Sequence, residues 1–119
     1  MKKILIADDD ENVRFLFSDM LGEAGFEIHT AVDGLQALKS LQDEKFDLVM
    51  TDIRMPEVNG QTLITCLRTM YQKVPVIIVS GFKDHGETLG KNIRAILLKP
   101  VDLDNLLKVV NEILNEKHN

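Results

Sequence analysis

The stretch ILIADDD at residues 4–10 joins a short apolar run to three consecutive aspartates. Apolar runs of this length that end in polar residues are typical of strands buried on both faces, as in a parallel sheet. Three further apolar runs end in the same way: 46–50 before Asp52, 76–79 before Ser80, and 95–98 before Lys99. Because such sheets bind ligands outside the carboxyl ends of their strands, we expect these polar residues to meet in one pocket.

Most of the segments between the apolar runs have apolar residues at the spacing of a helix. Strands are expected at 4–7, 27–31, 46–51, 74–79 and 95–98. Helices with an apolar stripe, which includes Leu16, Leu35 and Met70, are expected at about 13–24, 33–44, 63–70 and 103–114. The loop 55–60 precedes the third helix, and the glycine-containing segment 81–92 predicts at most a short helix. Strands that alternate with helices predict a three-layer, doubly wound, parallel α/β sheet.

Composition limits the classes of protein that fit. A chain of 119 residues with 45% apolar residues predicts a single domain over 1–119 with a real core. The net charge of −5, without a basic run, argues against direct nucleic-acid binding. No apolar stretch approaches about 18 residues, so no membrane span is expected. Cys66 is the single cysteine, which favours a reducing, cytoplasmic location.

The polar residues after the strands form a reactive combination. Carboxylates from Asp8, Asp9 and Asp52 would repel one another unless a cation intervenes, and Mg²⁺ is the natural guest for such oxygen ligands. A carboxylate can attack phosphorus and form an acyl phosphate, provided that the transferring oxygens are neutralised. Lys99 supplies a compact positive charge for this purpose, and Ser80 supplies a small hydroxyl donor. The neighbouring residues Asp10, Asp33 and Asp102 are predicted to cap helices, and the four aromatic residues Phe15, Phe17, Phe26 and Phe46 are predicted to pack in the core or between helices.

Four motifs, in this order and over essentially the whole chain, resemble the receiver domains of two-component response regulators. They are ILIADDD at 4–10, DIRMP at 52–56 with Gly60, Ser80-Gly81, and Lys99-Pro100. The resemblance implies a flavodoxin-like fold with five strands in the order 2-1-3-4-5. It also implies that Asp52 is the phosphoacceptor and that Ser80 and Lys99 contact the phosphoryl group. The implied site for Mg²⁺ (or Mn²⁺) consists of Asp9, Asp52 and the backbone carbonyl of Arg54, with Asp8 acting mostly through water.

The same resemblance implies the partners of the chain. The phosphoryl donor would be a phosphohistidine on a sensor histidine kinase or on a histidine phosphotransfer protein. A downstream protein target would read the face built from the family's fourth helix (segment 81–92), the strand 95–98 and the last helix. The domain would catalyse only its own phosphorylation and dephosphorylation, and no effector domain is expected in this chain.

Two features depart from the usual pattern of the family. Ile96 stands where most receivers carry Tyr or Phe, so coupling through an aromatic rotamer is not expected. The segment from Ser80 to Lys99 is shorter than usual, which predicts a short, shifted or partly unwound fourth helix of the family within 81–92. We expect output to depend on Ser80 and this segment instead.

Three other classes of protein share some of these features. A flavodoxin-type FMN binder needs a loop that accepts phosphate after the first strand, where Asp8 and Asp9 would repel it. A haloacid dehalogenase-type phosphatase needs a second carboxylate two residues after its nucleophile, and Arg54 occupies that position. A pseudo-receiver, which binds proteins without being phosphorylated, remains the alternative. His29, His85 and His118 lie too far apart in sequence to suggest a metal site.

Overall fold

The structure is a computed structural model, and it describes residues 1–53, 60–81 and 91–115. The strands are β1 Lys3–Ala7, β2 Glu27–Ala31, β3 Leu48–Thr51, β4 Val76–Ser80 and β5 Ile93–Leu98. The helices within the described residues are α1 Glu11–Glu23, α2 Gly34–Asp43, α3 Gly60–Met70 and α4 Leu103–Leu114. The alternation of strands and helices expected from the sequence is therefore present.

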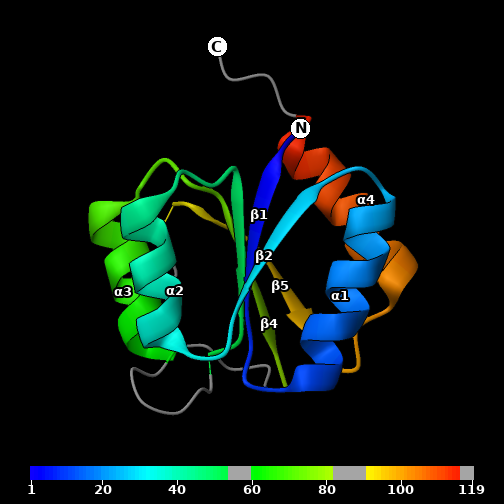
Figure 1. Ribbon diagram of the computed structural model, residues 1–119, viewed down its shortest axis with the longest axis horizontal. Helices are drawn as coiled ribbons and strands as arrows, with labels where there is room; N and C mark the ends of the chain where they lie inside the picture. Colours follow the sequence, from blue (N-terminus) through cyan, green and yellow to red (C-terminus); the bar gives the residue numbers. More distant parts are fainter. Residues whose placement is uncertain (54–59, 82–90, 116–119) are drawn as a thin grey trace.

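All five strands run parallel in the order β2-β1-β3-β4-β5. Helices α2 and α3 cover one face of the sheet, and α1 and α4 cover the other (Figure 1). The predicted three-layer, doubly wound architecture and its strand order are thus confirmed. In register, Ala7 of β1 lies beside Thr51 of β3, and Ser80 of β4 lies beside Leu98 of β5, so the residues that follow share one edge of the sheet.

The core lies in two layers, one on each side of the sheet. Successive residues of β1 point to opposite faces of the sheet, as the pleat requires. Leu5 packs in the layer that contains Ile64 of α3, whereas Ile4 packs in the layer that contains Leu106 of α4. Each of these side chains is fully buried, and burial of one such side chain contributes about 1.5–3 kcal/mol. This packing fixes the strand ends that carry the polar residues.

Aspartates begin three of the helices, as predicted. The side chains of Asp10, Asp33 and Asp102 accept hydrogen bonds from the backbone N–H groups of Asn12, Gln36 and Asn105, respectively. Such caps each contribute about 1 kcal/mol. Gly25, which follows α1, has φ of 100°, a backbone conformation that favours glycine.

Three strands begin two residues away from the predicted start. β3 and β4 each begin two residues later than expected, at Leu48 and Val76, although the preceding Phe46 is buried. The N–H of Val74 instead donates to the carbonyl of Tyr71, in a turn before β4. β5 begins two residues earlier than expected, because an edge strand exposed on one side can accommodate the charged Arg94.

Four apolar residues predicted to be packed are exposed instead. Phe15, Leu16, Leu35 and Met70 have exposed fractions of 68%, 50%, 59% and 67%. In α1 the buried residues are Phe17 and Leu21, so Leu16 lies on the flank of the buried face. The apolar pattern therefore predicted the helices correctly but overestimated the width of their buried faces.

Some sequence predictions concern residues outside those described. They include most of the loop 55–60, whose last residue begins α3, and most of the segment 81–92. No helix in the described parts of the chain has both the length and the apolar character needed to cross a membrane.

Candidate functional site

Four of the predicted site residues meet at the carboxyl edge of the sheet. Asp8 follows β1, Asp52 follows β3, Ser80 ends β4, and Lys99 follows β5. Backbone hydrogen bonds fix the strand ends beside one another, since the N–H of Asp52 donates to Ala7 O (3.0 Å) and that of Lys99 to Ser80 O (2.9 Å). Strand pairing rather than the loops therefore determines where these residues lie.

The Lys99 ammonium bridges two of the carboxylates. Its Nζ donates to Asp52 Oδ2 at 2.7 Å and to Asp8 Oδ2 at 3.0 Å. The side chains of Asp8 and Asp52 are only 3% and 10% exposed, whereas that of Lys99 is 28% exposed. Lys99 therefore spans the pocket from its rim to its buried acids. The Lys99-Pro100 peptide bond is cis.

Asp8 is held from the helix side as well. Its Oδ1 accepts a hydrogen bond from the backbone N–H of Asp10 (2.9 Å), and its carbonyl accepts one from Nη1 of Arg14 (2.8 Å). The sequence reasoning did not identify Arg14 as a supporting residue. Its acceptor is a backbone carbonyl, so the sequence carries no specific signal for this contact.

Burial and excess negative charge perturb the groups of the pocket. Burial raises the pKa of the Asp8 carboxyl, and the nearby Asp52 adds to this, although the Asp10 N–H and the Lys99 ammonium oppose it. Burial alone would lower the pKa of the Lys99 ammonium, but its hydrogen bonds to Asp52 and Asp8 outweigh that effect and raise the pKa. Both directions follow from a buried pocket with more carboxylates than cations.

Asp9 joins the buried pair at the rim of the pocket. One carboxylate oxygen from each of Asp8, Asp9 and Asp52 lies within 4.8 Å of the other two. Asp9 is exposed, so water can reach this side of the cluster. Three carboxylates beside one ammonium leave a net negative pocket of oxygen donors, which fits a hard divalent cation. The predicted fourth contributor, the backbone carbonyl of Arg54, lies outside the described residues.

Ser80 and Thr51 complete the described inner part of the site. Ser80 is buried, with an exposed fraction of 1%, and its carbonyl is the acceptor for the Lys99 N–H. Thr51 is also buried, and its hydroxyl donates to the carbonyl of Asp52 at 2.9 Å. Thr51 was not singled out from the sequence, although its place before the central aspartate indicates a supporting role. Ile96 of β5 is half-buried and packs against the core layer below α2 and α3.

Comparison with known proteins agrees with this geometry. The family model described as the response regulator receiver domain matches residues 4–111. Regulatory protein AtoC from Escherichia coli is 36% identical over 118 residues, which cover 96% of this chain and 25% of AtoC. The transcriptional regulatory protein PrrA from Mycobacterium bovis is also similar, and this chain spans about half of its length (51%) and a quarter (25%) of the length of AtoC.

Solved structures show the same relationship. The receiver domain of the Francisella response regulator 1452 is 30% identical, with a TM-score of 0.87 and coverage of 96% of this chain and 97% of that one. The response regulator TrrA from Thermotoga maritima, solved in complex with Mg²⁺-BeF, is 31% identical, with a TM-score of 0.85 and coverage of 95% and 99%. The chain therefore belongs to the response regulator receiver domain family.

Proposed function

We propose that this domain is a Mg²⁺-dependent switch that accepts a phosphoryl group on Asp52. The observation that carries the proposal is the position of Asp52, a nearly buried carboxylate 2.7 Å from the Lys99 ammonium and clustered with Asp8 and Asp9. Membership of the receiver family supports it. Asp52 is the nucleophile in this account, and Asp8 and Asp9 are the acidic ligands of the metal ion.

The reaction is a transfer between two carriers. An oxygen of Asp52 attacks phosphorus, a P–O bond forms, and the P–N bond of a donor phosphohistidine breaks, so that the donor imidazole leaves with the electron pair and takes up a proton. The donor is a sensor histidine kinase or a histidine phosphotransfer protein. Water later attacks phosphorus in the acyl phosphate, which restores the Asp52 carboxylate and releases inorganic phosphate.

Each residue of the pocket contributes a separate effect. Asp8, Asp9 and Asp52 would hold Mg²⁺ or Mn²⁺, which when bound neutralises negative charge on the transferring group. Lys99 already donates to Asp52, so its ammonium is positioned to stabilise charge on phosphoryl oxygens. Ser80, at the buried end of β4, offers a hydroxyl to the same group once Asp52 is modified. Asp8 accepts a hydrogen bond from the Asp10 N–H at its carboxylate and one from Arg14 at its carbonyl, and together these hold its side chain in place.

Ile96 is consistent with signalling to partners that does not use the rotamer of an aromatic side chain at this position. It is half-buried in β5 beside Ile78 and packs in the core layer, so it forms an apolar contact rather than a mobile ring. We propose that Ser80 and the segment that follows it respond to the phosphoryl group and shift the population of conformers. Partners would read the face formed by this segment, β5 and α4.

This part of the proposal predicts where activation acts. Addition of beryllofluoride with Mg²⁺, a stable mimic of the phosphoryl group, should shift the backbone amide resonances from Gly81 to Asn92 more than those of β2 and α2. The measurement is a pair of amide NMR spectra with and without beryllofluoride. Unchanged resonances in that segment, with binding proved by shifts at Asp52, would contradict the proposed output.

The proposed chemistry is tested by intact mass. The wild-type chain is incubated with phosphoramidate and Mg²⁺ beside Asp52→Ala and beside Asp47→Ala, a control that removes a carboxylate remote from the pocket. We expect one added phosphoryl group on the wild type and on Asp47→Ala, none on Asp52→Ala, and loss of the added mass with hydroxylamine. A wild type that binds beryllofluoride but gains no phosphoryl group from phosphoramidate or from a phosphohistidine donor would instead be a pseudo-receiver.

A further inference from the structure

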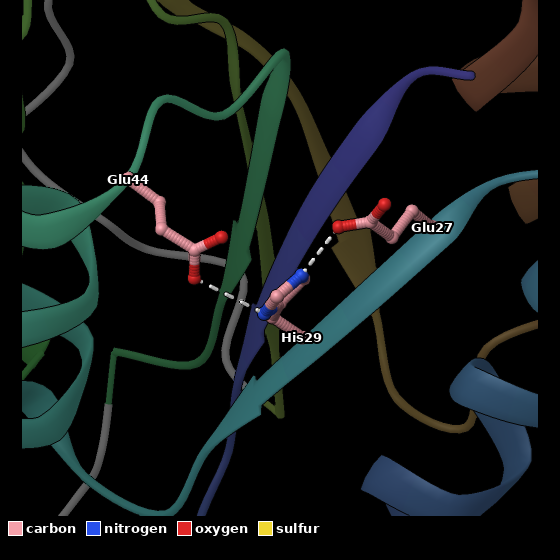
Figure 2. Close-up of side chains that lie close together, drawn as sticks. All are labelled: Glu27, His29 and Glu44. Carbon is pink, nitrogen blue, oxygen red and sulfur yellow. Dashed lines mark hydrogen bonds and ion pairs between the residues drawn. The ribbon is translucent and has the colours of Figure 1, made fainter.

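A second group of titratable side chains lies at the opposite edge of the sheet. Lys3 begins β1. Glu27 and His29 lie in β2, and Glu44 is the C-cap residue that follows α2 (Figure 2). Lys3 is paired in register with Glu27, at the amino ends of their strands, whereas the acidic pocket follows the carboxyl ends. The group is therefore separate from the proposed phosphoacceptor site.

Glu27 and His29 form a pair of contacting potential ligands on one strand. Residues two apart in a strand share a face, so both side chains project to the same side of β2. Nε2 of His29 lies 2.7 Å from Oε2 of Glu27. The imidazole is also in edge contact with the ring of Phe46, with 5.4 Å between the ring centroids, which limits its rotation.

Glu44 supplies a third donor from a different element. Its Oε2 lies 3.4 Å from Nδ1 of His29, on the opposite side of the imidazole from Glu27 (Figure 2). One potential ligand atom from each of Glu27, His29 and Glu44 lies within 4.8 Å of the other two. The side chains are 45%, 32% and 38% exposed, so ions and water reach them without opening the core.

The donor set favours a particular class of ion. One imidazole nitrogen with two carboxylates suits zinc and related transition metals, whereas Mg²⁺ prefers oxygen ligands alone. Three protein ligands with a position open to water is a common arrangement for zinc. The two metal-ligand clusters found among the described residues thus differ in chemistry, since the pocket at the carboxyl edge has only oxygen donors.

Lys3 is a competing cation within the group. Its Nζ lies 3.0 Å from Oε1 of Glu44 and 3.6 Å from Oε2 of Glu27, so its ammonium already sits between the two carboxylates. The hydrogen bond to Glu44 raises the pKa of Lys3, and the hydrogen bond to His29 lowers the pKa of Glu27. A divalent ion must displace this ammonium, and the flexible stem of lysine allows that.

We propose that Glu27, His29 and Glu44 form a binding site for a divalent transition-metal ion of the zinc type. Lys3 limits the affinity of the site because its ammonium competes for the same carboxylates. A bound ion would tie β2 to the end of α2 without touching Asp52. This proposal does not rest on the proposed phosphoryl transfer.

Zinc titration calorimetry in saturating Mg²⁺, which occupies the acidic pocket, tests this site. We expect one Zn²⁺ per wild-type chain, at least ~10-fold weaker binding in His29→Gln and in Glu44→Gln, and tighter binding in Lys3→Met. His85 and His118 are present in every variant, so any zinc that they bind persists in His29→Gln. Thermal melts of the variants in EDTA check that each is folded.

A second readout uses Co²⁺, whose visible absorption reports its ligands. Bands typical of low-coordinate Co²⁺ are expected in wild type and Lys3→Met and should be lost in His29→Gln. Equal zinc affinity in wild type, His29→Gln and Glu44→Gln would overturn the proposal. Absence of zinc binding in both wild type and Lys3→Met would also overturn it, because the second variant removes the competing cation.

Discussion

The two edges of the sheet carry similar residues in opposite electrostatic settings. At the carboxyl edge, Asp8 and Asp52 are nearly buried, and three carboxylates share one ammonium. At the amino edge, Glu27 and Glu44 are partly exposed, and both contact the Lys3 ammonium and the His29 imidazole. The first arrangement buries excess negative charge, which destabilises the fold, whereas the carboxylates of the second are open to solvent.

This difference in burial predicts that the carboxyl edge responds more strongly to a bound ligand than the amino edge. Buried charge without sufficient compensation is costly, and it is typical of sites that gain stability only when a ligand arrives. Exposed ion pairs contribute little to stability and are screened by salt. A metal ion at the carboxyl edge should therefore change the stability of the chain strongly, whereas one at the amino edge should change it weakly.

Replacement of Lys99 should have the largest effect. Lys99→Ala removes the fixed cation beside Asp52, and loss of one such electrostatic contact lowers rates by about 100-fold or more. We expect phosphorylation by phosphoramidate to slow by this order while Mg²⁺ affinity is not weakened, because the ammonium competes with the metal. Rates come from timed intact-mass spectra, with the exposed Lys91→Ala as the matched control. A rate equal to that of the control would show that Lys99 is not part of the reaction.

Replacement of Asp8 should sharpen the contrast in stability. The pKa of Asp8 is raised above 3.8 by burial, so the folded state holds this proton more tightly, and stability falls as the pH rises from 3.8 through the raised pKa. Asp8→Asn removes that loss, so in EDTA its melting temperature at neutral pH should exceed that of the wild type. The measurement is a series of melts between acidic and neutral pH, with the helix-capping Asp10→Asn as control. A variant less stable than wild type at neutral pH would contradict this account.

The same melts with Mg²⁺ test where the ion binds. At about 100 times its dissociation constant, an ion that binds only the folded state stabilises it by about 2.7 kcal/mol. We expect most of this gain to disappear in Asp8→Asn and to remain in Asp10→Asn. An equal Mg²⁺ gain in both variants would place the ion elsewhere.

Replacement of His29 should have the smallest effect. His29→Gln breaks ion pairs of partly exposed groups, so in EDTA the melting temperature should change less than in Asp8→Asn. Phosphorylation of Asp52 should keep the wild-type rate, because no contact links His29 to the acidic pocket among those described. A slower phosphorylation in this variant would mean that the two edges are coupled.

The sequence predicted the fold and the pocket for physical reasons that can be named. The carboxyl ends of parallel strands share one edge of the sheet. Residues that follow strands, such as Asp52 and Lys99, could therefore be predicted to lie together from the sequence alone. Helix faces were less predictable, since Leu16 and Leu35 fit the apolar period but lie on its exposed flank. The apolar periodicity of a helix shows which side of the helix is buried, but not how many residues on that side are buried.

The amino-edge cluster could not be predicted because one of its members, Glu44, follows a helix rather than a strand. Glu27 and His29 were visible as alternate residues of one strand, but Glu44 joins them only through the packing of α2 against the sheet. Arg14 was missed for another reason, because its contact is with the carbonyl of Asp8 rather than with a side chain. Backbone acceptors leave no mark in a sequence pattern.

Reduction of the acyl phosphate shows which residue carries the phosphoryl group. The chain is incubated with phosphoramidate and Mg²⁺, reduced with borohydride, digested and sequenced by tandem mass spectrometry. An acyl phosphate on aspartate is reduced to homoserine, so we expect homoserine at position 52 and unmodified aspartate at positions 8 and 9. Homoserine at another position, or none in a chain that has gained a phosphoryl group, would contradict this expectation.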